Sequence, residues 1–320
     1  EISPRDWSSD VCSSDLAQLV TAADRPALLA QLSLAAPATE SEAGTRLLLK
    51  ALAESDDGKG IKGDAALRER VRKLLADPVA TRAQMDVVVN FATDITKALA
   101  PEAGADRKAL SGAFDAALTR LEADASLSRA DRLGALIGRV QLARIDVPKD
   151  ERHPKLPTAL VQRVRDHVAR DDKEITDGYE RQAVVTSGAW ALGEVGQWAE
   201  SDALLKANLA KSHSPYYLMS QLAGNARKLG KKDEALRWYE ESYAKSEGPA
   251  TRLQWGSGYF SALVELAPQD EPRIERVARQ LFAEAAKDPA AFHERSARSL
   301  QRVAASWPSG TRAASTRPPC

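Results

Sequence analysis

The sequence predicts an all-α fold in which antiparallel helical hairpins stack one after another as an α-solenoid. Apolar residues recur at the helical spacing i, i+3, i+4 in nearly every window between residues 17 and 307. None of these windows shows the sustained alternation of apolar and polar residues that a strand requires. Strong helix formers dominate the composition, and the breaks between apolar stripes are short, so consecutive helices are expected to pack antiparallel.

Residues 17–145 form a first group of predicted hairpins, which is rich in Ala and Leu. Charged residues lie opposite each apolar stripe, as half-buried helices require. The segment 54–63 (ESDDGKGIKG) is expected to be a loop, and Pro101 ends the second stripe. The stripes consist of Leu67, Val71 and Leu74; of Val88, Phe91, Ile95 and Leu99; and of Leu133, Leu136, Ile137 and Val140.

A linker is expected at residues 146–157, where three prolines and a cluster of charges interrupt the helical pattern. Residues 158–307 form the second predicted domain, and its first stripe consists of Leu160, Val164 and Val168. All six tyrosines of the chain lie in this second domain. Because aromatic side chains bury more area than Ala or Leu, the second domain is expected to have the thicker core.

The strongest pattern within this second domain is a repeat with an offset of 34 residues. LAKSHSP at 209–215 recurs as YAKSEGP at 243–249, and the same offset relates Gly196 to Gly230. Both glycines are expected in the turn of a hairpin, where a positive φ or the absence of a Cβ helps. Further matched pairs are Ser201 with Ala235, Leu205 with Tyr239, Leu209 with Tyr243, and Pro215 with Pro249.

A period of 34 residues is that of the tetratricopeptide repeat, and residues 183–249 resemble two such units. The resemblance implies a tetratricopeptide-like array of stacked helix pairs, which holds a protein or peptide partner in its concave groove. The sequence departs from the family pattern in the first helix, where Ala189 and Ala223 stand in place of the expected Gly. The closing proline also comes about two residues late.

Residues 214–268 resemble a second family. The segments SPYYLMSQLA, ALRWYEESYAKSEGPATRLQWG and ALVELAP are similar to the C-terminal helical region of bacterial thioredoxin-family proteins of the cell envelope. This resemblance implies an upstream thioredoxin domain with a Cys-x-x-Cys pair, and a periplasmic location. The two cysteines here are Cys12 and Cys320, which form no such pair, so no redox residue is carried over.

Both ends of the sequence differ from its body. Residues 6–16 (DWSSDVCSSDL) resemble the translation of a sequencing adapter, and they lack helical periodicity. We therefore interpret residues 1–16 as a non-native, disordered segment, and we expect the native protein to extend further upstream. Residues 308–320 contain Pro, Gly, Ser, Thr and Arg without an apolar stripe, which predicts a disordered tail.

The sequence predicts no catalytic, cofactor-binding or metal-binding site. The four histidines lack a second His or a Cys at metal-ligand spacing, and all four are expected at the surface. The glycine-rich segment 58–63 follows a helix and not a strand, so it is expected to be a loop and not a phosphate cradle. The four histidines are His153, His167, His213 and His293.

Charge and hydropathy exclude two further classes of partner. Lys plus Arg is 45 and Asp plus Glu is 45, so the formal net charge is zero, which disfavours a dedicated nucleic-acid binder. No run approaches the roughly 20 apolar residues that a membrane-spanning helix needs. The sequence therefore predicts a protein or peptide as the partner.

Aromatic residues supply the candidate binding surface. Tyr239 and Tyr243 share a stripe with Leu236 and are expected in the core. Four other aromatic residues are predicted to form a peptide-binding surface, and packing in the core is the alternative for them. These four residues are Tyr216, Tyr217, Trp238 and Trp255.

Three functions stay open at this point. The first is a non-catalytic helical-repeat binding or scaffold module, which is a fragment of a longer bacterial protein and uses no cofactor. The alternative is the C-terminal helical region of a thiol-disulfide protein whose catalytic domain is missing here. The third is the helical sensor region of a regulator. A Cys-x-x-Cys pair encoded upstream of Ala17 would favour the second, and a DNA-binding helix-turn-helix there would favour the third.

Overall fold

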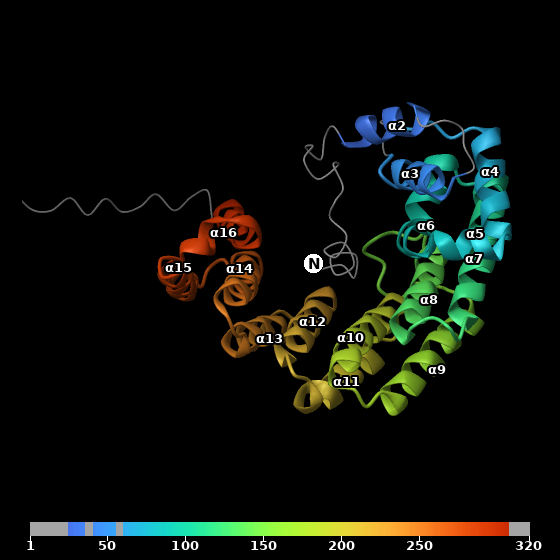
Figure 1. The fold of residues 1–320 in the computed structure, drawn as a ribbon. Helices are drawn as coiled ribbons and strands as arrows, with labels where there is room; N and C mark the ends of the chain where they lie inside the picture. Colours follow the sequence, from blue (N-terminus) through green and yellow to red (C-terminus); the bar gives the residue numbers. More distant parts are fainter. Residues whose placement is uncertain (1–24, 36–40, 56–59, 307–320) are drawn as a thin grey trace, which may run out of the picture. The chain divides into compact units, whose positions relative to one another are not determined.

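The structure is a computed structural model that describes residues 25–35, 41–55 and 60–306. Throughout these residues the regular structure is helical and contains no strand, which confirms the all-α prediction (Figure 1). The expectations for residues 1–16 and 308–320 concern segments outside the described residues.

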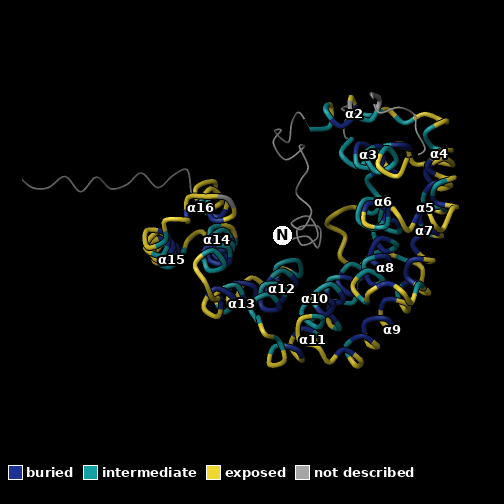
Figure 2. The backbone as a smooth tube through the Cα atoms, viewed as in Figure 1, coloured by how far each residue is buried: buried dark blue, intermediate teal, exposed yellow. Residues whose placement is uncertain are grey.

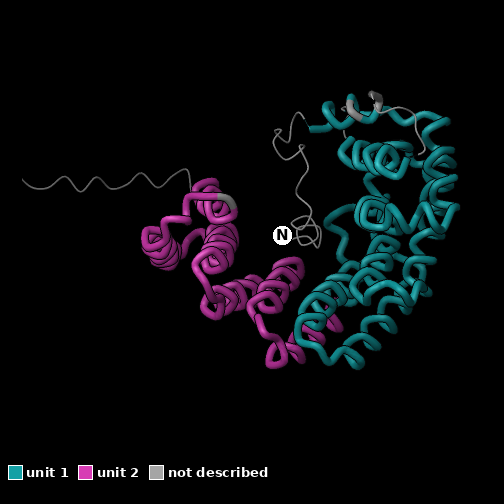
Figure 3. The backbone as a smooth tube through the Cα atoms, viewed as in Figure 1, with its two compact units in different colours: residues 1–197 teal, residues 198–320 magenta. Residues whose placement is uncertain are grey.

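The chain divides into two compact units, residues 1–197 and residues 198–320 (Figure 3). The linker expected at residues 146–157 lies inside the first unit, and the boundary falls at the turn that precedes Trp198. Arg144 explains why the proline-rich segment stays within unit 1. Its Nη2 donates to the carbonyl of Glu151 at 2.9 Å, and its Nη1 donates to the carbonyl of Glu194 at 2.6 Å.

Unit 1 contains nine described α-helices, and side-chain caps fix where many of them begin. Ser41, Asp64, Asp77, Ser128 and Asp177 each accept a hydrogen bond from a backbone N–H of the first turn. The helices are α2 (Arg25–Ala35), α3 (Glu42–Ala53), α4 (Ala65–Ala76), α5 (Pro78–Ala83), α6 (Met85–Leu99), α7 (Ala105–Ala123), α8 (Arg129–Ala143), α9 (Thr158–Glu174) and α10 (Gly178–Glu194).

The core of unit 1 lies around α6 and α7. α7 packs against α4, α6 and α8, and Phe114 of α7 is fully buried. The predicted stripe of α6 is confirmed, because Val88, Ile95 and Leu99 are all buried. Phe91 is half-buried at a kink in this helix, where its φ of −125° and ψ of 16° leave the helical region. Buried residues, dark blue in Figure 2, follow the helix faces that meet inside the unit.

Unit 2 is organised around α14. This helix packs against α13, α15 and α16, while α12 packs against both α11 and α13. Tyr259 and Phe260 of α14 are fully buried in the core. The elements are α11 (Trp198–Asn208), the 3-10 helix η2 (Leu209–Lys211), α12 (Pro215–Lys228), α13 (Lys232–Lys245), α14 (Pro249–Leu266), α15 (Glu271–Ala285), the 3-10 helix η3 (Pro289–Phe292) and α16 (Glu294–Ser306).

The core positions predicted on α13 are confirmed. Tyr243 is 4 % exposed, and Tyr239 is half-buried against the same cluster. Arg252 lies over the Tyr243 ring, with its guanidinium carbon 4.8 Å from the ring centroid. Burial raises the pKa of the Tyr243 hydroxyl, and the neighbouring carboxylate of Glu284 adds to that rise. Tyr243 therefore stays neutral over the physiological range.

The two glycines separated by 34 residues adopt the same turn, as the sequence predicts. Gly196 has a φ of 82° and Gly230 a φ of 73°. The N–H after each glycine donates five residues back, from Gln197 to Leu192 at 2.8 Å and from Lys231 to Ala226 at 2.9 Å. This is the pattern of a helix C-terminus closed by a left-handed glycine. The two turns therefore share the same local backbone conformation.

Valine at position 230 tests the role of this turn. A β-branched residue in the left-handed region is strained, although no atom would contact a Cβ added at Gly230. We expect Gly230→Val to lower the free energy of unfolding of unit 2 by about 1–2 kcal/mol, measured by urea denaturation. Gly224→Ala is the matched control, since Gly224 lies inside α12 with open space around it and should gain stability. An unchanged midpoint for Gly230→Val would contradict the turn assignment.

Candidate functional site

Three of the four predicted surface aromatics form one cluster, which we call the aromatic surface: Tyr216, Tyr217 and Trp255. The ring centroids of Tyr216 and Tyr217 lie 4.9 Å apart. Trp255 lies 5.1 Å from Tyr217 in an edge-to-face arrangement and 6.1 Å from Tyr216. These separations are those of favourable aromatic pairs, so the three rings form one contiguous patch.

The three rings come from two helices, α12 and α14. Pro215 is the first residue of α12, so Tyr216 and Tyr217 occupy its first turn. Ser242 of α13 donates its hydroxyl to the carbonyl of Tyr216 at 2.8 Å, which ties the start of α12 to α13. Trp255 lies in the second turn of α14, which also packs against α13.

A glycine lets α14 approach its neighbours beside Trp255. A Cβ on Gly256 would lie 2.4 Å from Cδ2 of Leu281 and 2.9 Å from the ring of Tyr243. Such distances are below any normal contact, so a larger residue would fit there only if the Leu281 and Tyr243 side chains moved. The position of Trp255 on α14 therefore depends on the small residue that follows it.

The aromatic surface is half-buried and contains an unsatisfied polar group. Tyr216 and Tyr217 are partly exposed, whereas Trp255 is 6 % exposed. Among the described residues, no acceptor is bonded to the buried indole N–H of Trp255. Burial raises the pKa of the Tyr217 hydroxyl and the Tyr216 hydroxyl adds to the rise, while the positive charge of Arg295 on α16 opposes it.

Trp238 does not join the aromatic surface. It lies on α13, is 8 % exposed, and packs under the guanidinium of Arg237 at 5.1 Å. Trp238 is four residues before Ser242, so both side chains occupy the face of α13 that meets α12. Packing in the core, the alternative that the sequence left open, is therefore the role of Trp238.

Unit 1 contains a buried charged cluster that connects α7, α8 and α9. Glu122 of α7, with a side chain 1 % exposed, forms ion pairs with Arg139 of α8 at 2.8 Å and with Arg163 of α9. His167 places Nδ1 3.7 Å from Glu122 and Nε2 3.2 Å from Asp171. Both of these α9 side chains are 3 % exposed. We call Glu122, Arg139, Arg163, His167 and Asp171 the buried charged cluster.

The surface position expected for His167 is wrong, whereas His153, His213 and His293 are exposed as predicted. The helical register explains the error. His167 lies three residues after Val164 and four before Asp171, so all three share the buried face of α9. This spacing can be read from the sequence, because His167 and Asp171 continue the apolar stripe of α9 that Leu160 and Val164 begin.

Opposing effects set the charges in this cluster. Burial alone would raise the pKa of Glu122, but the nearby His167 and hydrogen bonds from Arg163 and Arg139 lower it from 4.5 to about 2. Burial alone would lower the pKa of His167, but hydrogen bonds to Asp171 and Glu122 outweigh it and raise this pKa above 6.5. The cluster is therefore a charged network that joins three helices, with each carboxylate directed at a cation.

This network predicts how stability depends on pH. The lowered pKa of Glu122 stabilises the fold above pH 4.5 and loses that effect as the pH falls towards about 2. The raised pKa of His167 stabilises the fold below pH 6.5 and loses that effect as the pH rises through the folded-state value. We expect urea denaturation of the full chain to show less stability at about pH 8.5 than at about pH 5.5. His167→Gln should abolish this alkaline loss, and an unchanged loss in that variant would contradict the assignment.

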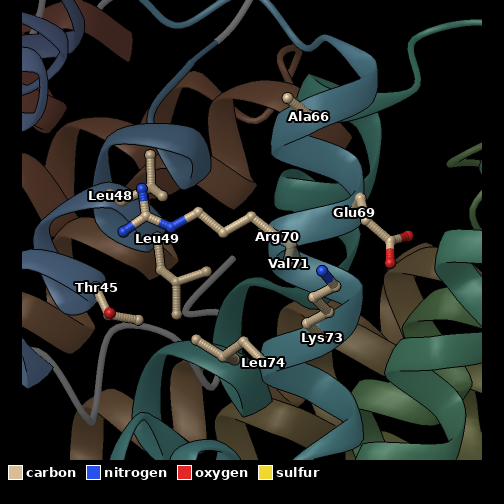
Figure 4. Close-up of a pocket in the computed structure, with 9 residues that line it drawn as sticks. All are labelled: Thr45, Leu48, Leu49, Ala66, Glu69, Arg70, Val71, Lys73 and Leu74. Atoms are coloured by element: carbon tan, nitrogen blue, oxygen red, sulfur yellow. The ribbon is translucent and has the colours of Figure 1, made fainter. Parts of the chain in front are cut away.

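An open cleft of about 610 Å³ lies between α3 and α4 (Figure 4). Leu48 and Leu49 of α3 and Val71 of α4 form its apolar lining. The Arg70 side chain extends from α4 towards α3, while Glu69 points away from it (Figure 4). The cleft thus has an apolar lining with charged side chains beside it, among them Arg70 and Lys73.

In the part of the chain that the structure describes, no group of three or more His, Cys, Asp or Glu side chains is arranged to hold a metal ion. None of the described helices combines the length and the apolar character needed to span a bilayer. Comparison with protein-family models, with curated proteins and with solved structures gave no match. Function is therefore inferred from the residues and their geometry.

Proposed function

We propose that this chain is a non-catalytic helical-repeat binding module, which holds a segment of a partner protein on the aromatic surface. A tetratricopeptide-like arrangement would make α12 with α13, and α14 with α15, two successive hairpins. Two features support it: Gly196 and Gly230 close identical turns, and Pro215 and Pro249 each begin the first helix of the next hairpin. Stacked hairpins of this kind present extended binding surfaces.

The observation that carries the proposal is the ring cluster between α12 and α14. In the proposed array α12 and α14 are the first helices of two consecutive hairpins. The first helices of stacked hairpins lie next to each other along the same face of the array. Tyr216 and Tyr217 are partly exposed, and the ring of the buried Trp255 packs against both of their rings. Tyrosine and tryptophan dominate the energetics of protein interfaces, because their rings bury much area at a small entropy cost.

A peptide selection tests this function. A random library of 12-residue peptides displayed on phage is selected on the full chain and, in parallel, on a Tyr216→Ala/Tyr217→Ala variant. We expect specific enrichment on the full chain and its loss on the variant, because truncating two interface tyrosines removes about 2 kcal/mol or more of binding energy.

Tyr179→Ala is the matched control, since Tyr179 is 78 % exposed in unit 1 and lies outside the proposed surface. This variant should retain the enrichment seen with the unmodified chain. The proposal would be wrong if no peptide were enriched on the unmodified chain, or if the double variant retained the same peptides with the same affinity.

A further inference from the structure

α16 carries a row of arginines on the side that faces away from the core. Ser296, Ser299 and Val303 are buried on one face of this helix. The exposed side contains arginines at positions i, i+3 and i+7, a spacing that places them along one flank of a helix. We call Arg295, Arg298 and Arg302 the arginine row.

The arginine row has no acidic partner among the described residues, and the same holds for Arg237 and Arg276 of unit 2, whereas four other arginines of the unit form ion pairs. Elsewhere in the unit, guanidiniums pair with carboxylates of other helices: Arg227 with Glu265, Arg252 with Glu284, and Arg273 with Glu240. α16 contains one acidic residue and three arginines, a net charge of 3 − 1 = +2. α15 instead alternates acidic and basic residues, as an ordinary solvated face does.

The arginine row lies on a helix that packs against α14, the helix that carries Trp255 of the aromatic surface. α16 packs against α14, and the hydroxyls of Ser261 and Ser306 meet at 2.8 Å across that interface. α14 also carries Trp255, whose ring contacts Tyr217. The positive charge of Arg295 opposes the rise in the pKa of Tyr217, in keeping with this packing. The arginine row and Trp255 of the aromatic surface therefore lie on two helices, α16 and α14, that pack against each other.

From this arrangement we infer that the partner segment is acidic, and that its carboxylates lie along the arginine row while an apolar or aromatic residue packs on Tyr216 and Tyr217. This inference rests on the proposed function and specifies the chemistry of the partner. Guanidiniums bind carboxylates through paired hydrogen bonds, and unpaired arginines are free to do so without breaking an existing ion pair.

Geometry sets the length of the acidic segment. Arg295 and Arg302 are seven residues apart, about 10 Å along the helix at 1.5 Å per residue. An extended peptide covers that distance in about three residues, at roughly 3.3 Å each. A run of three to four residues rich in Asp or Glu, next to one aromatic residue, therefore matches the surface.

The composition of selected peptides tests this inference. The random 12-residue library is selected on the full chain and on an Arg295→Gln/Arg298→Gln/Arg302→Gln variant. We expect peptides from the full chain to be enriched in Asp and Glu. Their affinity, measured by fluorescence anisotropy, should fall at least tenfold in the triple variant and should weaken as salt increases. Lys211→Gln/Lys232→Gln/Lys245→Gln is the control, because it removes the same charge from exposed residues elsewhere in unit 2.

The outcomes separate this inference from the function on which it rests. Enriched peptides without acidic residues, or acidic peptides bound equally by both triple variants, would overturn the inference and leave the binding module intact. Absence of any enrichment would overturn both. A labelled single-stranded DNA that binds the full chain and displaces the peptides would also overturn the inference, because the arginines would then contact phosphates.

Discussion

Glu122→Ala is expected to lower the free energy of unfolding by about 3 kcal/mol at pH 7. The substitution leaves the Arg139 guanidinium, 18 % exposed, without the carboxylate that it faces in the interior. His167, which is 3 % exposed, loses the same partner. Removing one member of a buried ion pair is costly because the remaining charge stays desolvated. Urea denaturation followed by circular dichroism measures the change.

Asp115→Asn is the matched control for Glu122→Ala. Asp115 pairs with the same arginine at 2.8 Å, but its side chain is 48 % exposed. Solvent screens exposed ion pairs, so this control should lose less than about 1 kcal/mol. Equal losses for the two variants would show that burial of the charged cluster does not govern its contribution to stability.

Phe260→Ala is expected to lower the free energy of unfolding of unit 2 by about 4 kcal/mol. Phe260 is 0 % exposed and lies in the core cluster of α14. Truncation removes the transfer free energy of the ring and leaves a cavity that the surrounding helices fill only in part. Thermal and urea denaturation measure the loss, and peptide binding should weaken with it, because α14 also positions Trp255.

Phe282→Ala provides the comparison within the same unit. Phe282 lies on α15 and is 51 % exposed, so its truncation removes little buried area and should change stability by less than about 1 kcal/mol. A loss for Phe282→Ala as large as that for Phe260→Ala would mean that the assignment of inside and outside in unit 2 is incorrect.

The buried charged cluster and the aromatic surface differ in how far their groups are exposed. The buried charged cluster holds α7, α8 and α9 together through ion pairs among its own members, and Glu122, His167 and Asp171 are buried. Tyr216 and Tyr217 of the aromatic surface are partly exposed, and the arginine row is exposed. For that reason the second region, and not the first, is assigned to binding.

The sequence predicted much of the fold but less of the candidate site. Apolar spacing identified the buried stripes of α6 and α8, and the 34-residue offset identified two equivalent turns. Of the four aromatic residues predicted to form a peptide-binding surface, Tyr216, Tyr217 and Trp255 have their rings together, whereas Trp238 packs between α13 and α12. Helical periodicity places a residue on a face of its own helix but does not say which neighbour covers that face.

The thiol-disulfide hypothesis stays a prediction about sequence upstream of this chain. It depends on a resemblance over residues 214–268, and Cys12 and Cys320 both lie outside the described residues. The tetratricopeptide resemblance likewise stays a proposal for the arrangement of the hairpins, and its local prediction, left-handed glycines at two equivalent turns, is met.

By itself the sequence determined the helical class, the helix-breaking turns and the apolar faces, because each depends on residues within one or two turns of each other. The tertiary structure alone decided where the units divide, that His167 meets Glu122, and that α16 packs against α14. These contacts join residues far apart in sequence, since 167 − 122 = 45 and, for the two serines that meet between α14 and α16, 306 − 261 = 45. Such pairs depend on which helix faces pack together, and a local period carries no information about that choice.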